Sequence, residues 1–495
     1  MSKKNKFKLG LVHGVFDVLH VGHIEHFKEA KKLCNKLVVS VTSDKFVNKG
    51  PNRPAFNIKE RINVLSSLKF VDDVIISNNE TAVESIKKIK PNVYFKGSDY
   101  KDVNINGKNN LRKEIVELKK NNGKFVITDT KLKSSSKILN ENYGYIKKDT
   151  QKFLKTINKV NFIKKLKESL LNNLVNTKKN SFIVIGEPIL DKYTKVKILG
   201  KSQKSSVIST AKSKSITYGG GVILVLNFLS DLVKQISYFG ILNNNVKNKI
   251  NSYFKKSARI NLAGINNKNE KIIQKERFID NYSQMRLFQT NTNEKFNLSH
   301  ELENLFNKKI LNYINNFKNI IIFDYGYYYM NKRLINLINK KNKNFFINCQ
   351  TNSSNFGFNL FKKYNKAEIL CIDEIELRLS FGEKIKEIKD ILKDNLNLLK
   401  KYKVFIVTSG SKGCHIVNSN KIKYIPTFFN TTRDTTGCGD IFFSFFIYLY
   451  CEKKYTLEEI AILSHLAAGN HGLIEGNKNI FSKEKFFKTA QSYIK

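Results

Sequence analysis

Short β-rich runs alternate with helix-period segments twice along this 495-residue chain, and this alternation restricts the fold more than any other feature. Between about residues 1 and 140, runs such as KLVVSVTSD and NVYFKGSD are separated by segments such as HIEHFKEAKKL. A second and larger alternation begins at residue 181 with SFIVIGEPILDKY. Strands that alternate with helices indicate parallel sheets covered by helices. We therefore predict two α/β domains.

A polar stretch separates the two alternations. Residues 141–180 are rich in lysine and asparagine and have helical spacing, so we predict a helical linker between domains at 1–140 and 181–495. Within the second domain, residues 191–218 and 270–290 contain β-rich runs without helices between them, which predicts a small β lid. Ligands of such parallel sheets bind at the carboxyl ends of the strands.

The composition is strongly basic, with 87 Lys and Arg against 42 Asp and Glu and a net charge of +45. Such a charge favours polyanions, but the basic residues are spread along the chain, and the lack of tryptophan and the excess of lysine, asparagine, isoleucine and phenylalanine suit an AT-rich coding sequence. We therefore expect small phosphorylated ligands, with no nucleic acid as the primary partner. The six cysteines form no CxxC pair, so reduced thiols are expected.

No run reaches the roughly 18 apolar residues that a membrane-spanning helix needs. The longest candidate, IFFSFFIYLYC at 441–451, follows a glycine-rich turn and is interpreted as a buried core helix. The amino-terminal segment is basic but lacks a signal-peptide cleavage site. We expect a cytoplasmic protein without a membrane partner.

The stretch HGVFDVLHVGHIEHF, which begins at His13, holds four of the eight histidines between a strand pattern and a helix pattern. His23 follows Gly22 in the first helical turn, where amide groups and the positive dipole end favour phosphate. His20 lies on the preceding loop, so both rings are expected to face one anion. Zinc would need three or four converging ligands, which the spacing does not supply. We assign no role to His13 or His26.

The pattern GVFDVLHVGH resembles the signature of the HxGH nucleotidyltransferases, in particular their cytidylyltransferase-like branch. The resemblance continues through VTSDKFVNKGPNRP, KERINVL, YFKGSDY and SSSKIL and covers nearly all of residues 9–139. It implies a Rossmann-like domain in which an acceptor phosphate attacks the α-phosphorus of a nucleoside triphosphate. The implied catalytic residues are His20 and His23, and the implied nucleotide-binding residues are Gly14, Phe16, Asp17, Gly22, Lys49, Arg61, Lys96, Gly97, Asp99, Ser135 and Ser136.

The resemblance also implies individual roles and a cofactor. Lys49 and Lys96 would add positive charge, and Ser135 and Ser136 would bind the leaving phosphates. Asp17 would orient the loop or the ligand. ATP is the implied substrate, with Mg²⁺ required as a cofactor, and positioning and charge stabilisation would dominate the chemistry.

The strongest motif of the second half is RDTTGCGDIFFSFFIYLY at 433–450. Gly437, Cys438 and Gly439 open an apolar helix, so three backbone amides are expected to face an anion at the positive helix end. Asp440 lies at the same helix start, where it can take a proton from a hydroxyl that attacks the bound phosphate. A carboxylate beside an oxyanion cradle is what phosphorylation of an alcohol requires.

This motif resembles the DTxGxGD signature of the ribokinase-like (PfkB) sugar kinases, and the resemblance extends over roughly 180–480. It implies a ribokinase-like α/β domain with Asp440 as the catalytic base and Mg²⁺ and ATP as before. No metal site made of protein groups alone is predicted. The other implied residues are Gly437, Cys438 and Gly439 in the anion hole, Asp191, Gly219 and Gly220 at the substrate, Thr408, Gly410 and Gly413 at the nucleotide, and Asp373 and Glu376 at magnesium or phosphate.

Four departures from that family pattern stand out. Glu187 replaces a usual aspartate, Ile223 replaces an asparagine, Asn348-Cys349-Gln350 replaces Asp-Pro-Lys, and Asp373-Glu374-Ile375-Glu376 replaces Asn-x-x-Glu. Loss of the asparagine side-chain amide at Ile223 should alter sugar selectivity more than phosphoryl transfer. The catalytic turn is intact, so we predict an active kinase, with a degenerate, non-catalytic kinase domain as the alternative.

Taken together, the two halves resemble the bifunctional ADP-heptose synthases with the domain order reversed. The implied reactions are phosphorylation of heptose 7-phosphate at O1 and transfer of AMP from ATP to the sugar 1-phosphate, with a separate phosphatase between them. A cytidylyltransferase for glycerol or polyol phosphate, fused to a kinase of other or lost specificity, is the first alternative. A polyanion-binding protein built on inactive domains is the second. Pairing of β lids in this kinase class adds a homodimer to the expectations.

Overall fold

The protein is described by a computed structural model, and it divides into two compact units. The first unit comprises residues 1–146 with 488–495, and the second comprises residues 147–487. The described residues are 6–47, 53–97, 109–128, 147–172, 182–233, 235–254, 259–291, 298–341, 343–429, 432–477 and 481–494.

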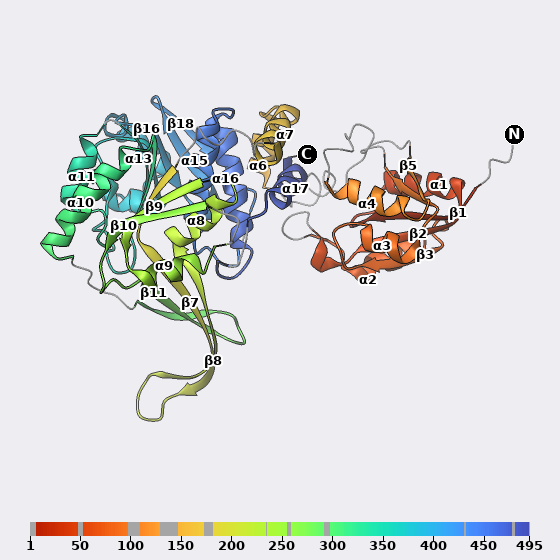
Figure 1. Ribbon diagram of the computed structural model, residues 1–495, viewed down its shortest axis with the longest axis horizontal. Helices are drawn as coiled ribbons and strands as arrows, with labels where there is room; N and C mark the ends of the chain where they lie inside the picture. The colour runs from red at the N-terminus through yellow and green to blue at the C-terminus, as the bar shows by residue number, and fades with distance from the viewer. Residues whose placement is uncertain are drawn as a thin grey trace. The chain divides into compact units, whose positions relative to one another are not determined.

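A five-stranded parallel sheet forms the centre of the first unit, with strand order β3-β2-β1-β4-β5 (Figure 1). The strands are β1 (Phe7–Gly14), β2 (Cys34–Thr42), β3 (Asp73–Ser77), β4 (Val93–Lys96) and β5 (Lys124–Ile127). The helices are α1 (Val21–Leu33), α2 (Ile58–Ser66), α3 (Val83–Ile89) and α4 (Asn109–Lys119), with a 3₁₀ turn η1 (Asp44–Phe46).

Both faces of this sheet are buried. Val12 of β1 packs in one apolar cluster with Phe27 of α1 and Leu65 of α2. Its neighbour Leu11 packs in a second cluster with residues of α3 and α4, including Leu118. Successive side chains of a strand point to opposite faces, so the strands feed two cores at once. This arrangement confirms the predicted Rossmann-like fold, and the strand order reverses between β1 and β4, where such sheets bind ligands.

The second unit is built on a nine-stranded sheet of order β10-β9-β6-β13-β14-β15-β16-β17-β18. Its strands run parallel up to β16, and β17 and β18 continue antiparallel. They are β6 (Phe182–Gly186), β9 (Gln235–Leu242), β10 (Arg259–Asn266), β13 (Asn319–Asp324), β14 (Asn344–Cys349), β15 (Ala367–Asp373), β16 (Tyr402–Thr408), β17 (Cys414–Asn418) and β18 (Lys421–Ile425).

Helices flank the strands of the second unit. They are α8 (Val222–Ser230), α9 (Asn244–Asn251), α10 (His300–Ile314), α11 (Lys332–Asn339), α12 (Glu374–Phe381), α13 (Ile388–Asp394), α14 (Leu396–Leu399), α15 (Cys438–Glu452) and α16 (Leu457–Gly472). The last helix, α17 (Lys483–Ile494), begins in the second unit, and its residues from 488 onward belong to the first. The apolar run at 441–451 lies in α15, and its residues from Ile441 to Leu449 are buried, as the sequence indicates. In the described part of the chain, no helix combines the length and the apolarity that a membrane span requires.

A separate four-stranded sheet of order β12-β11-β7-β8 forms the expected small lid. It consists of β7 (Pro188–Lys201), β8 (Ile208–Gly221), β11 (Ile273–Asp280) and β12 (Arg286–Asn291). β7 and β8 form a long antiparallel hairpin whose tip extends away from the main sheet of the second unit (Figure 1). β11 joins β7 in parallel and β12 in antiparallel pairing.

Part of the predicted linker belongs to the second unit. Residues 148–172 form α6 (Lys148–Lys155), α7 (Lys159–Lys167) and a π-helical turn η4 (Glu168–Asn172). The Thr150 hydroxyl donates to the carbonyl of Thr427 at 2.7 Å, and the Tyr448 hydroxyl donates to the carbonyl of Ser169 at 3.2 Å. These buried hydrogen bonds fix the stretch onto the second unit, because a flexible linker would leave such groups in water.

Candidate active sites

The start of α1 carries the two predicted catalytic histidines. His20 is the N-cap residue, and its carbonyl accepts hydrogen bonds from the amides of His23 and Ile24 at 2.9 and 3.2 Å. The rings of His20 and His23 stack with centroids 4.0 Å apart and planes inclined by 17°. The structure therefore brings both imidazoles together at the positive end of a helix, directly beyond the carboxyl end of β1.

Phe16 supports this pair from an unusual backbone conformation. It has φ of 48°, a left-handed value that is rare for an aromatic residue and is retained mainly where surrounding packing requires it. Its ring meets the edge of His23 at 5.5 Å and of Phe27 at 5.2 Å. A Cβ at Gly14 would lie 2.8 Å from the Phe16 ring. Gly14 therefore makes room for Phe16, and Phe16 in turn supports His23.

Asp17 anchors the segment that follows β2 and η1. Its carboxylate accepts a hydrogen bond from the Phe56 amide at 3.0 Å and lies 3.4 Å from the Arg53 guanidinium. The Asp17 side chain is fully buried. Of the two roles expected for Asp17, these contacts favour orientation of the loop over contact with a ligand.

Arg61 lies beneath the histidine turn. Its guanidinium is buried and donates to the carbonyls of Val15, Thr42 and Phe56 and to the carboxylate of Asp44, at 2.5 to 3.0 Å. The sequence suggested contact with nucleotide. In the structure, every nitrogen of Arg61 is instead bonded to protein acceptors, so the residue ties the ends of β1 and β2 to the segment before α2.

Substitution of Arg61 by methionine should lower the free energy of unfolding of the first unit by about 3 kcal/mol, because three buried carbonyls would lose their donor. Differential scanning calorimetry of the full chain measures the effect. Lys59→Met, on the exposed side of the same helix, is the matched control. An unchanged first-unit transition in the Arg61 variant would contradict the structural role.

Lys96 ends β4 and Gly97 follows it. Because β4 pairs with β1, both residues lie beside the histidine turn, at the point where the strand order reverses. The Lys96 ammonium lies 3.7 Å from the Glu114 carboxylate and 5.2 Å from the centre of the Tyr94 ring. Gly22 lies in the first turn of α1. The other predicted residues of this site, Lys49, Asp99, Ser135 and Ser136, fall outside the described residues.

The two histidines to which the sequence assigned no role are buried. His13 bonds through Nδ1 to the Ser40 hydroxyl at 3.0 Å, and His26 bonds through Nδ1 to the Thr128 hydroxyl at 2.6 Å. Burial, followed by the charge of Lys96, lowers the pKa of each ring to about 4. Both rings are therefore neutral near pH 7 and connect elements of the core.

The second candidate site centres on Asp440, in the first turn of α15. Its carboxylate accepts a hydrogen bond from the Gln350 side-chain amide at 2.7 Å and is 7% exposed. Burial, together with the Asp191 carboxylate, raises the pKa of Asp440, and the net value is about 7. Gln350, Lys275 and Tyr325 act in the opposite direction. A carboxyl group with a pKa near neutrality is suited to general-base chemistry.

The turn before Asp440 has one fewer amide for an anion than the sequence suggested. Gly437 caps α15 with φ of 76°. The Cys438 amide already donates to the carbonyl of Thr435 at 3.1 Å, and its thiol points to the carbonyl of Ala468 at 3.4 Å. A Cβ at Gly439 would meet no atom within 4 Å, so Gly439 borders open space. Cys438 is thus not an anion-hole donor in this arrangement, because its amide closes the turn.

The three predicted substrate residues lie together at the base of the lid. The Asp191 carboxylate accepts hydrogen bonds from Arg277 at 2.5 Å and from Asn477 at 3.1 Å. Asn477 also donates to the carbonyl of Gly219 at 2.9 Å. A Cβ at Gly220 would lie 2.0 Å from the Asp191 carboxylate, so only glycine fits there. The lid strands β7, β8 and β11 thus converge on one buried acidic group.

Asp434, the first acidic residue of the RDTTGCGD motif, joins the lid to the anion-hole turn. It accepts hydrogen bonds from the Tyr193 hydroxyl at 2.8 Å, from the amides of Thr436 and Gly476 at 2.9 Å, and from Arg286 of β12. Burial alone would raise its pKa, but these donors outweigh burial and hold the pKa of Asp434 well below its usual value. Asp434 is therefore ionised and connects both lid hairpins to the helix start.

The predicted nucleotide residues form a tight turn at the carboxyl end of β16. Thr408 pairs with Asp373 of β15, and the Ser409 amide donates to the carbonyl of Gly413 at 2.8 Å. Gly410 has φ of 53°. The turn lies at the ligand-binding end of the parallel strands, as a nucleotide site there would require.

Asp373 and Glu376, the residues expected at magnesium or phosphate, have a structural role at the start of α12. They form a capping box at α12: the Glu376 amide donates to Asp373 at 2.8 Å, and the Asp373 amide donates to Glu376 at 2.7 Å. The other Glu376 oxygen accepts from the Thr351 amide at 2.7 Å. Burial, followed by the charge of Asp373, raises the pKa of Glu376. Among the described residues, no three His, Cys, Asp or Glu side chains are grouped to hold a metal ion.

Comparison with known proteins identifies both units. A sequence profile of the pfkB family of carbohydrate kinases matches residues 179–470, more than half of the chain. The chain belongs to the pfkB carbohydrate kinase family. A profile described as cytidylyltransferase-like matches residues 11–211. The protein is therefore an enzyme that carries a cytidylyltransferase-like nucleotidyltransferase domain followed by a pfkB sugar kinase domain, which confirms the predicted families and their order.

Individual relatives match the nucleotidyltransferase domain. Bifunctional protein HldE of Campylobacter concisus is 41% identical over 117 residues, 23% of this chain and 25% of the relative. Bifunctional protein HldE of Paramagnetospirillum magneticum is 46% identical over 95 residues, 19% of this chain and 20% of the relative. These alignments span about a quarter or less of the length of these curated relatives.

Solved structures that resemble the chain are sugar kinases. Ribokinase of Thermotoga maritima aligns with a TM-score of 0.46 and 16% identity over 62% of this chain and 97% of its own. Phosphofructokinase-2 of Escherichia coli, in complex with potassium, aligns with a TM-score of 0.49 and 14% identity over 64% of this chain and 99% of its own.

Two departures from the pfkB pattern are buried away from solvent. Glu187 accepts hydrogen bonds from the amides of Tyr328 and Tyr329 at 3.0 and 2.9 Å, and burial raises its pKa to about 7. Ile223, in place of the family asparagine, is 1% exposed and lies against Gly219, where an added Cβ would be 2.4 Å from its side chain. The base of the lid therefore meets an apolar methyl group of Ile223, whereas the family asparagine would place a polar side-chain amide there.

Several residues of the kinase site were missed by the sequence interpretation. Gln350 was noted only as a departure, and Asp434 was quoted within its motif without a role. Lys275 and Arg277 lie two residues apart in β11, a spacing that places two basic side chains on one face of a strand and was available as a signal. Asn477 lies beyond α16 without any local pattern that marks it.

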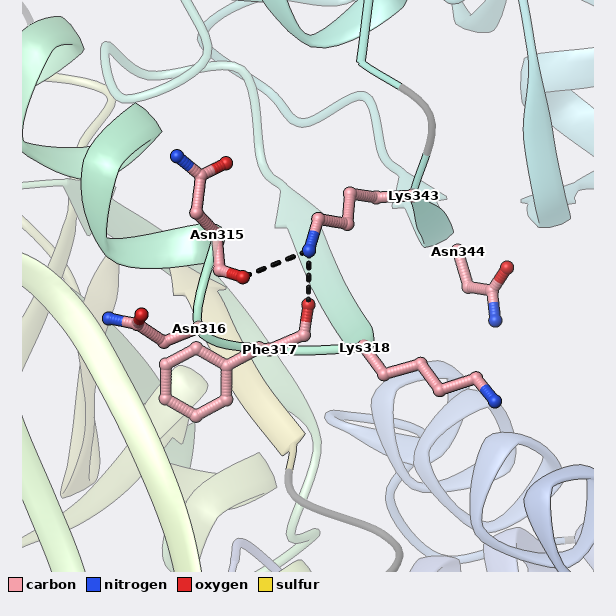
Figure 2. A pocket seen from close by; sticks show the side chains of 6 residues that line it. All are labelled: Asn315, Asn316, Phe317, Lys318, Lys343 and Asn344. Carbon is pink, nitrogen blue, oxygen red and sulfur yellow. Dashed lines mark hydrogen bonds between the residues drawn. The ribbon is translucent and has the colours of Figure 1, made fainter.

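A surface pocket of about 330 Å³ in the kinase domain lies apart from this chemistry (Figure 2). It is lined by residues 315–318, Lys343 and Asn344, and Lys343 donates to the carbonyls of Asn315 and Phe317 at 2.9 and 3.3 Å. These residues lie at the amino ends of β13 and β14, whereas Gln350 follows the carboxyl end of β14. The pocket is therefore at the end of the sheet opposite the candidate active site.

Proposed function

We propose that this enzyme makes a nucleotide-activated sugar in two steps, with heptose 7-phosphate as the acceptor of the first. In the kinase domain, the anomeric hydroxyl at O1 attacks the γ-phosphorus of ATP, ADP leaves, and Asp440 takes the hydroxyl proton. The observation that carries the proposal is the buried Asp440 carboxylate at the start of α15. Its charge interacts with that of Asp191, the lid carboxylate to which Arg277 donates. Thr408, Gly410 and Gly413 are proposed to contact the ATP.

The second step belongs to the nucleotidyltransferase domain. After removal of the 7-phosphate by another enzyme, a phosphate oxygen of the sugar 1-phosphate attacks the α-phosphorus of ATP, pyrophosphate leaves, and ADP-heptose forms. His20 and His23 are proposed to stabilise the charge that develops on the α-phosphate. Similarity of the first domain to relatives named HldE supports this pairing of activities. Mg²⁺ is expected to arrive with the triphosphate, whose oxygens are its usual ligands.

Product identification tests the proposal. Purified full-length protein is incubated with ATP or CTP, magnesium and a panel of seven-carbon and six-carbon sugar phosphates, and the products are identified by mass spectrometry. We expect a heptose bisphosphate with ATP, and a nucleotide sugar when heptose 1-phosphate is supplied. Turnover of CTP with glycerol phosphate or a polyol phosphate, without turnover of ATP at the first domain, would support the alternative cytidylyltransferase instead.

We also propose that two copies pair through the lid. Exposed apolar residues gather at the tip of the β7–β8 hairpin, namely Ile198, Leu199, Val207 and Ile208, which are 42 to 64% exposed. Apolar side chains clustered on a projecting hairpin favour association. Sedimentation should give the mass of a dimer for the native chain and of a monomer for Leu199→Lys. A monomeric native chain would contradict the pairing.

A further inference from the structure

Lys275 lies on the inner face of the lid. In β11 it pairs with Asp191 of β7, and Arg277, two residues further along the same strand, donates to the Asp191 carboxylate. The intervening residue, Glu276, points the other way and bonds to Lys192 and Thr194. Because alternate residues of a strand share a face, Lys275 faces the same side as Asp191 and Arg277.

The Lys275 ammonium has no anion of its own in the described part of the chain. No hydrogen bond or ion pair joins it to another described residue, and it lies 5.8 Å from the centre of the Tyr327 ring. Burial lowers the pKa of Lys275, whereas the carboxylates of Asp191 and Asp440 raise it. Lys275 is half-buried, so its ammonium is open to an anionic group that a ligand supplies.

The position that would otherwise supply a cation is neutral in this chain. Where resembling kinases have Asp-Pro-Lys, this chain has Asn348-Cys349-Gln350. The Gln350 side chain donates to Asp440 at 2.7 Å, so it orients the base. An amide carries no charge to oppose a transferred phosphoryl group, whereas the half-buried Lys275 ammonium interacts electrostatically with both Asp191 and Asp440.

We propose that Lys275 is a further catalytic residue of the kinase domain, and that its ammonium binds the phosphoryl group during transfer. The inference rests on the proposed kinase reaction. The bond from the sugar oxygen to the γ-phosphorus forms, the bond from that phosphorus to the β–γ bridging oxygen breaks, ADP leaves and the proton goes to Asp440. Lys275 donates hydrogen bonds to a non-bridging oxygen of the transferred group, which offsets charge in the transition state.

The test uses the full-length enzyme with Lys275→Met. We expect kcat for ATP-dependent sugar phosphorylation to fall about 100-fold, as for loss of one charge-stabilising donor. The melting temperature should stay the same, because Lys275 is half-buried and bonds to no other described residue, so an apolar chain of similar length leaves no partner unsatisfied. Lys275→Arg should recover part of kcat. Loss of activity together with unchanged stability is not expected of a lysine that only supports the fold.

The pH profile gives a second readout. Four described groups act on Asp440: Asp191 of β7, Lys275 of β11, Tyr325 after β13 and Gln350 after β14. Gln350, Lys275 and Tyr325 favour the ionised base and Asp191 opposes it, so removal of the Lys275 charge should move the acidic limb of the kcat/KM profile to higher pH. A purely structural lysine would leave that limb in place.

Lys192→Met is the matched control, since Lys192 lies on the opposite face of the lid, 3.1 Å from Glu276, and should leave kcat unchanged. Lys275→Met with kcat within threefold of the native enzyme, or with a lost fold, would overturn the proposal. If the native enzyme phosphorylates no sugar phosphate, the proposed kinase function itself fails. An active native enzyme with an unaffected Lys275 variant removes only the inference about Lys275.

Discussion

Substitution of Asp440 by asparagine should lower kcat for ATP-dependent sugar phosphorylation about 10³- to 10⁴-fold, because a general base contributes on that order. Asparagine keeps the shape of the side chain but cannot accept the hydroxyl proton. Asp440 is buried at the start of α15 and is oriented by Gln350. Nucleotidyl transfer should be unchanged, since it occurs in the other domain.

The same carboxyl group sets the pH dependence of the kinase. Burial raises the pKa of Asp440 to about 7, and only the ionised form acts as a base. The value of kcat/KM should therefore rise with pH up to about 7 and level off above it. Initial rates of ADP formation between pH 5.5 and 9 measure this pH dependence. The range extends about one and a half pH units or more to each side of the expected pKa, so both limbs of the curve are sampled.

A matched variant separates the base from a general effect of charge. Asp390 also lies in the first turn of a helix, α13, but its side chain is exposed and 3.4 Å from Lys393. Asp390→Asn should keep full kinase activity. An Asp440→Asn enzyme that retains more than about a tenth of native kcat would contradict the assignment, since loss of a base costs at least 100-fold.

Replacement of His20 or His23 by alanine should lower the rate of nucleotidyl transfer about 10²- to 10³-fold, with kinase activity unchanged. The two rings stack 4.0 Å apart at the start of α1, and the Phe16 ring packs against the His23 ring at an interplanar angle of 81°. A phosphate at this helix end would meet both imidazoles and the positive dipole together. Loss of either ring removes one of these favourable interactions with the developing charge.

Pyrophosphate release with ATP and with CTP, in the presence of a sugar 1-phosphate, measures this effect and identifies the preferred nucleotide. Lys32→Ala is the control, because Lys32 is exposed in the last turn of the same helix, away from the histidine turn. If the two histidine variants and the control all release pyrophosphate at the native rate, the histidine turn is not the nucleotidyl-transfer site. Salt-sensitive nucleic-acid binding that survives these variants and Asp440→Asn would favour the polyanion-binding alternative.

Much of the fold follows from local signals in the sequence. The alternation of β-rich runs and helix-period segments is set by which side chains can be buried, so both parallel sheets and the lid were predictable. The two helix starts were predictable as well, because glycine-rich turns before apolar helices leave a local pattern. His20, His23 and Asp440 were located in this way.

The tertiary structure decided what each polar side chain near those helix starts does. Arg61, Asp373 and Glu376 resemble ligand contacts in sequence, yet they bond to backbone groups that only the folded chain brings within reach. The Cys438 amide is used within its own turn.

Conversely, part of the kinase site is formed by residues that lie far apart in sequence, namely Asp191 of β7, Lys275 of β11 and Asn477 beyond α16. Lys275 and Asn477 both interact with Asp191 only because the lid strands pair across long loops. Hydrogen bonds and charges act over a few ångströms, whereas sequence patterns report on neighbours along the chain, so this half of the site required the structure.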